Sequence, residues 1–169
     1  ALAQYRTWGI PIEIAVMTNV THEHLDYHGT FEKYRAAKMK LFRGAKYGVV
    51  NADDSSADWF EKAVGDGKYI TYGIKNGDLR ADEVKMRADG VEYSCGDIKI
   101  RTQIPGRFNV YNSLAAVAVG QKIGLTDEEI EQGIFALDAV EGRMTRVRKG
   151  QDFEVIVDYA HTLDALENV

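Results

Sequence analysis

The part of the chain richest in reactive side chains is Thr21–Thr30, which reads THEHLDYHGT. Three of the chain's four histidines, His22, His24 and His28, fall in this stretch together with two carboxylates. Imidazole and carboxylate groups at such short spacing are the side chains that bind metal ions or transfer protons. The stretch is therefore a candidate metal site, a candidate catalytic cluster, or a polar loop that is rich in histidine.

A binuclear zinc hydrolase is the first alternative, because His22, His24 and Asp26 form an H-x-H-x-D pattern. The HxHxDH motif of such enzymes has a histidine directly after the aspartate, where this sequence has Tyr27. Those enzymes also need further histidines downstream, and only His161 remains, so a two-zinc site would lack ligands. This disfavours zinc and leaves open a polar loop whose histidines bind backbone groups.

The segment after the histidines carries a lysine at an unusual position. Phe31–Arg43 (FEKYRAAKMKLFR) predicts a helix, and at about 100° per residue its apolar stripe contains Phe31, Tyr34, Leu41 and Phe42. Lys38 falls in the middle of that stripe. Such a lysine can extend its ammonium group to water. Alternatively it stays inside, where burial favours a neutral amine that can add carbon dioxide. The resulting carbamate is an anionic oxygen ligand, so Lys38 and the histidine-rich loop could hold magnesium between them.

The elements that position these residues alternate between strands and helices. Strands are predicted over Ile12–Val20, Lys46–Asn51, Tyr69–Tyr72 and Phe153–Val157, and the first and last of these are expected to be buried. Helices are predicted over Phe31–Arg43, Asp58–Val64, Asn112–Ile123 and Thr126–Leu137. The last of these helices opens with capping-box spacing between Thr126 and Glu129. Arg80–Ile104 contains alternating runs around an Asp-Gly turn, which predicts a small antiparallel sheet.

This order predicts an α/β fold, with a mainly parallel sheet flanked by helices and a small antiparallel sheet insertion. In such folds ligands bind beyond the carboxyl ends of the parallel strands. Thr21–Thr30 and Asp158–His161 (DYAH) each follow a predicted strand. We therefore expect both segments at that edge of the sheet.

Composition narrows the class of protein. The chain has 169 residues, is 45% hydrophobic and carries a net charge of −5, which suits one globular domain and disfavours a nucleic-acid partner. Its single cysteine, Cys95, fits a reducing compartment. No apolar run approaches the ~20 residues of a membrane span, so no membrane partner and a cytoplasmic location are expected. The chain begins at Ala1 rather than methionine, and we expect it to be a piece of a longer protein.

Several segments together resemble one family, the Mur ligases. The segments that match their central domain are TNVTHEHLDYHGTFEKYRAAKMKLF, ALAQYRTWGI, IPGRFNVYNSLAA, EGRM and VDYAHTLDALENV, and they occur over essentially the whole chain. The last segment is most similar to the MurE type, because sister ligases differ after Asp158. MurE-type enzymes add the third amino acid to UDP-N-acetylmuramoyl-L-alanyl-D-glutamate.

The resemblance implies roles for individual residues. Lys38 corresponds to a carbamylated lysine and His24 to a histidine, both of them catalytic and both ligands of magnesium. Gln4 and Arg6 correspond to residues that contact the muramoyl substrate. ATP is implied to bind at Asn109, Asn112, Arg143, Asp158 and His161. From the residues alone, Asn112 could instead cap the helix that it begins, and Arg143 could be a surface arginine.

The resemblance also implies a reaction, its co-substrates and a domain boundary. ATP and Mg2+ would serve an amide ligation between the UDP-MurNAc-dipeptide and meso-diaminopimelate or L-lysine, through an acyl phosphate. No G-x-x-x-x-G-K-[ST] phosphate loop occurs in the sequence. Residues 1–169 are therefore expected to be the later part of the central domain and to be inactive alone. The open alternatives are another Mur ligase, a folylpolyglutamate synthetase, or a non-catalytic remnant that binds a nucleotide sugar.

Overall fold

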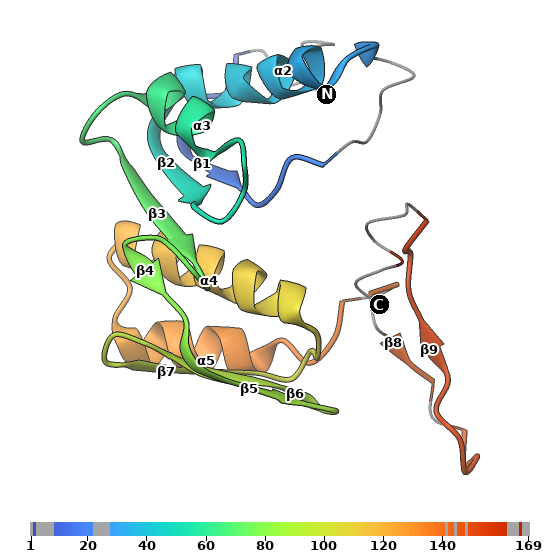
Figure 1. The fold of residues 1–169 in the computed structure, drawn as a ribbon. Helices are drawn as coiled ribbons and strands as arrows, with labels where there is room; N and C mark the ends of the chain where they lie inside the picture. The colour runs from blue at the N-terminus through green and yellow to red at the C-terminus, as the bar shows by residue number, and fades with distance from the viewer. Residues whose placement is uncertain are drawn as a thin grey trace.

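A parallel sheet lies at the centre of the N-terminal half of the protein (Figure 1). The computed structural model describes residues 2, 9–21, 28–140, 142–143, 145–147, 149–161 and 166. The strands follow one another in chain order, namely β1 (Ile12–Met17), β2 (Ala45–Asn51), β3 (Tyr69–Gly73) and β4 (Leu79–Arg80). All neighbouring pairs are parallel, with Met17 opposite Val50 and Asn51 opposite Tyr72. The carboxyl ends of the strands therefore share one edge, as predicted.

Two helices cover one face of this sheet. They are α2 (Phe31–Gly44), which matches the predicted helix, and α3 (Ala57–Val64). Their apolar sides meet at Phe42 and Phe60, whose rings pack edge to face with centroids 4.8 Å apart. Met17 and Val50 of the sheet are buried in the same cluster. Burial of this face fixes how α2 lies over β1 and β2, and so where Lys38 can reach.

A third helix, α4 (Arg107–Lys122), lies between the parallel sheet and the predicted antiparallel sheet. The antiparallel sheet consists of β5 (Asp82–Arg87), β6 (Gly90–Cys95) and β7 (Ile98–Thr102), and α5 (Asp127–Ala136) packs beside α4. Val110, Leu114 and Val117 of α4 are fully buried. These residues pack together with buried residues of both sheets in one hydrophobic cluster, which is the main core of the protein.

Two predicted boundaries were wrong. The strand predicted over Ile12–Val20 ends at Met17, and the next residues continue as irregular chain. The helix predicted from Asn112 begins at Arg107, after Gly106 with a φ of 104°. Asn112 therefore lies inside α4, and the alternative that it caps this helix was wrong. An N-cap with no side chain left no capping signal in the sequence.

The last predicted strand also differs from expectation. Only Ile156–Val157 (β9) is a strand, and it pairs antiparallel with β8 (Thr145–Arg146) in a separate two-stranded sheet beside the main body (Figure 1). Ile156 and Val157 are 41% and 49% exposed, so the prediction of a buried strand was wrong. An apolar run predicts a strand but not the partner that would cover it. Asp158–His161 consequently do not follow a strand of the parallel sheet.

Candidate functional site

The carboxyl edge of the parallel sheet is held by polar side chains that follow β2. The amide Nδ2 of Asn51 donates to the carbonyl oxygen of Thr18 at 2.7 Å, and the N–H of Val20 donates to Asp54 Oδ2 at 2.8 Å. The hydroxyl of Tyr72 donates to the carbonyl of Met17 at 3.2 Å. These bonds fix the chain that leaves β1 and leads into the histidine-rich stretch.

Lys38 reaches this edge from α2. Its Nζ donates to the carbonyl oxygen of Asn19 at 3.3 Å and lies 4.6 Å from the centroid of the Tyr34 ring. The side chain is half-buried, which lies between the two alternatives of a buried amine and one that extends to water. The amine is thus directed at the segment immediately before the histidines. His24 itself falls in residues 22–27, outside the described part of the chain.

The two asparagines predicted to bind the nucleotide lie together in the first turns of α4. Nδ2 of Asn109 donates to the carbonyl of Pro105 at 2.7 Å, and its Oδ1 accepts from Nδ2 of Asn112 at 3.2 Å. Their spacing of three residues places them on one side of the helix. Both line a cavity of about 300 Å³ between α4 and α5, whose other walls include Ile130 and Leu137. An apolar slot with a few amides at its rim can hold a flat heterocycle.

The remaining nucleotide candidates gather around one tyrosine. The guanidinium of Arg143 lies 5.8 Å from the centroid of the Tyr159 ring, and the ring of His161 packs edge to face on it at 4.8 Å. The N–H of Tyr159 donates to the carbonyl of Gly142 at 2.7 Å. Asp158 accepts at Oδ1 from the N–H of Ala160 at 2.8 Å. The structure therefore brings Arg143, Asp158 and His161 to one end of the β8–β9 hairpin.

Arg143 also approaches the asparagine cavity indirectly. It lines a second cavity of about 510 Å³, whose walls include Thr102 and Ile104. Both of these residues also line the cavity that contains Asn109 and Asn112. The two cavities therefore share Thr102 and Ile104 as lining residues. Lys38, on the opposite face of the parallel sheet, lines neither cavity. Gln4 and Arg6 fall in residues 3–8, which are not among those described.

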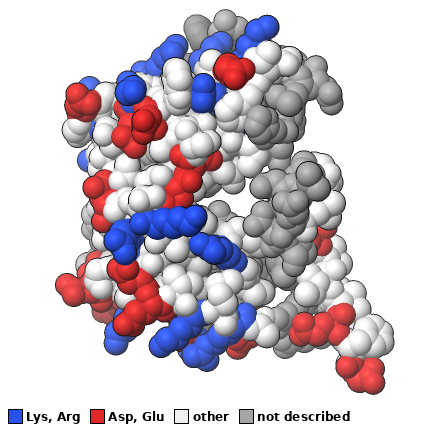
Figure 2. Space-filling model, in the orientation of Figure 1, with Lys and Arg blue, Asp and Glu red and all other residues white. Residues whose placement is uncertain are grey.

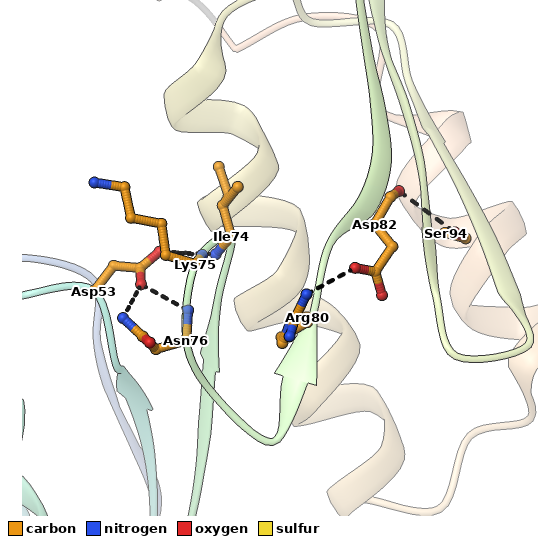
Figure 3. A network of polar contacts seen from close by, with 7 residues as sticks. All are labelled: Asp53, Ile74, Lys75, Asn76, Arg80, Asp82 and Ser94. Atoms are coloured by element: carbon orange, nitrogen blue, oxygen red, sulfur yellow. Dashed lines mark hydrogen bonds and ion pairs between the residues drawn. The ribbon is translucent and has the colours of Figure 1, made fainter.

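Sequence reasoning missed one polar centre at the same edge. Asp53 accepts four hydrogen bonds from the loop between β3 and β4, shown in Figure 3, and one from the hydroxyl of Tyr111 at 3.0 Å. Three of the loop donors are the backbone N–H groups of Ile74, Lys75 and Asn76, at 2.8–2.9 Å. The local signal was only the run NADD at the end of a strand, which marks an Asx turn rather than distant partners.

These contacts set the acidity of Asp53. Partial burial raises the pKa of the carboxyl group, but hydrogen bonds from the N–H groups of Lys75 and Ile74, from the Tyr111 hydroxyl and from Asn76 outweigh it. The net pKa of Asp53 lies below its ordinary value. The pKa of Tyr111 is raised by burial and by the Asp53 carboxylate, although Arg107 opposes this change. Asp53 is therefore an ionised acceptor that joins β2, the β3–β4 loop and α4.

Solved structures define the class of fold. The structure superposes on MurF from Acinetobacter baumannii with a TM-score of 0.84 at 22% identity, covering 92% of this chain and 36% of that one, which shows a shared fold. It also superposes on a structure of UDP-N-acetylmuramoyl-L-alanyl-D-glutamate–2,6-diaminopimelate ligase with a TM-score of 0.81 at 32% identity. That match covers 98% of this chain and 36% of the other. The fold is that of the central domain of Mur-type ligases.

Comparison with related sequences assigns the chain to a family. Residues 1–120 match the model of the Mur ligase middle domain, and the chain belongs to the Mur ligase family. It is 42% identical over its whole length to UDP-N-acetylmuramoyl-L-alanyl-D-glutamate–2,6-diaminopimelate ligase of Bacillus velezensis and 41% identical to the ligase of that name from Thermosynechococcus vestitus. The chain spans 37% and 36% of the length of these two relatives.

Proposed function

We propose that this chain is the later part of the central domain of a MurE-type ligase, which joins UDP-N-acetylmuramoyl-L-alanyl-D-glutamate to a diamino acid. The observation that carries this proposal is the 40–42% identity, over nearly the whole chain, to ligases that bear this name. The names of these relatives favour 2,6-diaminopimelate over L-lysine as the incoming amino acid.

The proposed reaction has two steps, and each makes and breaks one bond at the reacting centre. An oxygen of the D-glutamate side-chain carboxylate attacks the γ-phosphorus of ATP, the bond to the β-phosphate oxygen breaks, and ADP leaves. The amine of the diamino acid then attacks the acyl carbon, inorganic phosphate leaves, and the nitrogen loses a proton. The first step brings two anions together, so cationic groups must offset their repulsion.

Magnesium fits this chemistry at the end of β1. We assign its ligands to Lys38, as a carbamate, and to His24. The direction of the Lys38 amine toward the chain before the histidines supports this choice. A protonated amine would repel a divalent cation, whereas a carbamate offers the oxygen ligands that magnesium prefers. The ion would neutralise charge between the nucleotide and the substrate carboxylate. Among the described residues no group of three or more His, Cys, Asp or Glu side chains is placed to hold a metal, so the proposal depends on residues 22–27.

The nucleotide is proposed to bind along α4 and the hairpin end. Asn109 and Asn112 would present their amides to the base at the cavity between α4 and α5, which their shared orientation supports. Arg143, Asp158 and His161 would bind the ribose and phosphates, where Arg143 supplies the positive charge. Gln4 and Arg6 would contact the muramoyl substrate. These seven assignments rest on the family's motifs.

The cellular location and the class of partner follow from the same proposal. Its substrates are cytoplasmic precursors of the cell wall, so we place the protein in the cytoplasm. No described helix has the length and apolarity to span a bilayer. On the face drawn in Figure 2, acidic and basic side chains are interspersed, with one band of basic residues across the middle. This mixed surface and the net charge of −5 support a protein without a nucleic-acid partner.

The proposal is tested with the full-length protein encoded by the gene that carries this sequence. The protein is incubated with UDP-MurNAc-dipeptide, ATP and Mg2+, and with either meso-diaminopimelate or L-lysine. We expect phosphate release and a product that is heavier by one diaminopimelate residue, and no product from the 169-residue chain alone. A product formed only with a different amine donor would indicate a sister ligase. Absence of any ATP-dependent product would contradict the proposal.

A further inference from the structure

The contacts of Asp53 join three elements that lie far apart in the sequence. Its carboxylate follows β2 and accepts from the loop between β3 and β4 through three backbone N–H groups and Nδ2 of Asn76. The carboxylate also accepts, at Oδ2, from the hydroxyl of Tyr111, which belongs to α4. In this network Asp53 links α4 to the carboxyl edge of the parallel sheet through hydrogen bonds.

The loop is held closely against this carboxylate. A Cβ placed on Gly73 would lie 2.3 Å from the carbonyl oxygen of Asn76 and 3.0 Å from Cγ of Asp53. No side chain fits in that space without a shift of the loop. The carboxylate is thus held at a fixed place by the loop, so it provides a stationary acceptor for Tyr111 rather than a mobile one.

The position of Tyr111 on α4 matters because it lies between Asn109 and Asn112 in the sequence. At about 100° per residue, Tyr111 projects about 200° around the helix from Asn109. A bond from Tyr111 to a fixed acceptor therefore limits rotation of the helix about its own axis, which decides where Asn109 and Asn112 point. A rotation of about 10° would move the tip of a side chain by on the order of 1 Å. Such a displacement is enough to weaken a hydrogen bond to a ligand.

We propose that Asp53, through Tyr111, is a positioning residue for nucleotide binding, because it sets the rotation of α4 that aims Asn109 and Asn112 at the cavity beside α5. The inference rests on the proposed function. It deepens that function, since it assigns the control of nucleotide affinity to a carboxylate that touches neither ATP nor metal. A merely structural role would change stability and leave the affinity for ATP unchanged.

The test uses the full-length protein with Tyr111→Phe, which removes one hydroxyl and leaves the loop bonds of Asp53 in place. We expect the KM for ATP to rise about three- to tenfold, with kcat within twofold and the KM for the muramoyl substrate unchanged, because a binding contact is lost equally before and during reaction. Asp53→Asn should act in the same direction. The double variant should raise the KM for ATP no further than Asp53→Asn alone, since the two residues act through one bond.

The matched control is Tyr69→Phe. The carboxylate of Glu61 raises the pKa of the Tyr69 hydroxyl, so the control also removes a tyrosine–carboxylate interaction, but at the amino end of β3 and toward α3. We expect a small loss of thermal stability and an unchanged KM for ATP. If Tyr111→Phe leaves the KM for ATP unchanged, or if Tyr69→Phe raises it equally, the positioning role is overturned while the ligase assignment stands. A wild-type protein that neither forms product nor binds ADP overturns both.

Discussion

The backbone N–H of Val20 donates a 2.8 Å hydrogen bond to Oδ2 of Asp54, which lies 34 residues further along the chain. The other oxygen of the same carboxylate accepts from the N–H of Ser56 at 2.8 Å, at the start of α3. One side chain therefore holds both the chain that leaves β1 and the turn that enters α3. Asn19, whose carbonyl oxygen accepts from Lys38, is the neighbour of Val20. The position of the Lys38 amine thus depends on Asp54.

Replacement of Asp54 by alanine should therefore be costly. The change leaves two backbone N–H groups without their acceptor, and loss of charged hydrogen bonds of this kind costs about 2–3 kcal/mol of unfolding free energy. Chemical denaturation of the wild-type and variant chains measures this difference. The exposed Asp66 provides the control, since Asp66→Ala should change the unfolding free energy by less than about 0.5 kcal/mol. Equal effects of the two changes would refute the role assigned to Asp54.

Two glycines, one in α4 and one in α5, should respond in opposite ways when each is replaced by alanine: one change should lower the stability of the fold and the other should raise it. A Cβ on Gly120 of α4 would lie 2.8 Å from Cγ1 of the buried Ile130, whereas a Cβ on Gly133 of α5 would meet no atom within 4 Å. Gly133→Ala should stabilise the fold by about 0.5–1 kcal/mol through helix propensity. Gly120→Ala gains the same propensity but overpacks the helix contact at a cost of about 1–3 kcal/mol.

The measurement is the thermal midpoint of each variant against the wild type. Gly133→Ala should melt above the wild type and Gly120→Ala below it. Both are alanine substitutions inside helices, so each serves as the control for the other. A Gly120→Ala protein as stable as Gly133→Ala would show that α4 and α5 are not closely packed at this point.

The sequence predicts those features whose cause lies within a few residues. The start of α5 is an example, because Thr126 and Glu129 form the predicted capping box with Glu129 Oε2 2.8 Å from the N–H of Thr126 and Thr126 Oγ1 3.2 Å from the N–H of Glu129. The start of α4 has no such signal. It begins at Arg107, after the N-cap Gly106, and its first turn is instead held by the bond from Asn109 to Pro105 and by burial of Val110.

The same distinction between local patterns and contacts of distant segments applies to the candidate site. Lys38 could be proposed as a site residue because its place in an apolar helical stripe is a local pattern, and in the structure its amine donates to the carbonyl oxygen of Asn19. Asp53 was missed because its partners are 21 to 58 residues away in the sequence. The β9 strand was placed wrongly for a related reason, since an apolar run does not say which strand pairs with it. Contacts between distant segments are the part that a single sequence leaves undetermined.

Acidification should reveal the contribution of Asp53 to stability. Its pKa in the folded protein is below the ordinary value, so the carboxylate stabilises the fold above about pH 4, and this stabilisation is lost as the pH falls through the folded pKa. Asp53→Asn cannot titrate. The difference in unfolding free energy between wild type and Asp53→Asn should therefore be largest near pH 6 and should shrink steadily between about pH 4 and pH 2.

Urea denaturation at a series of pH values measures that difference. Asp66→Asn, at an exposed aspartate, corrects for acid effects common to the whole protein. If the difference in unfolding free energy between wild type and Asp53→Asn stays constant from pH 6 to pH 2, the hydrogen bonds to Asp53 do not depend on its charge. The network would then be a packing contact rather than an electrostatic one.

The assignment of Lys38 as a carbamate can be separated from a simple structural role of its side chain. In the full-length protein, Lys38→Ala should lower kcat by at least about a hundredfold, because charge stabilisation at the reacting phosphate is lost. Exposed Lys33 lies on the same helix, and Lys33→Ala should leave kcat unchanged. Wild-type protein equilibrated with 13C-labelled bicarbonate should show a carbamate carbon signal that is absent from Lys38→Ala and present in Lys33→Ala. If Lys38→Ala retained wild-type turnover at every bicarbonate concentration, Lys38 would be a side chain that only anchors α2 to Asn19, and the magnesium ligands would have to come from elsewhere.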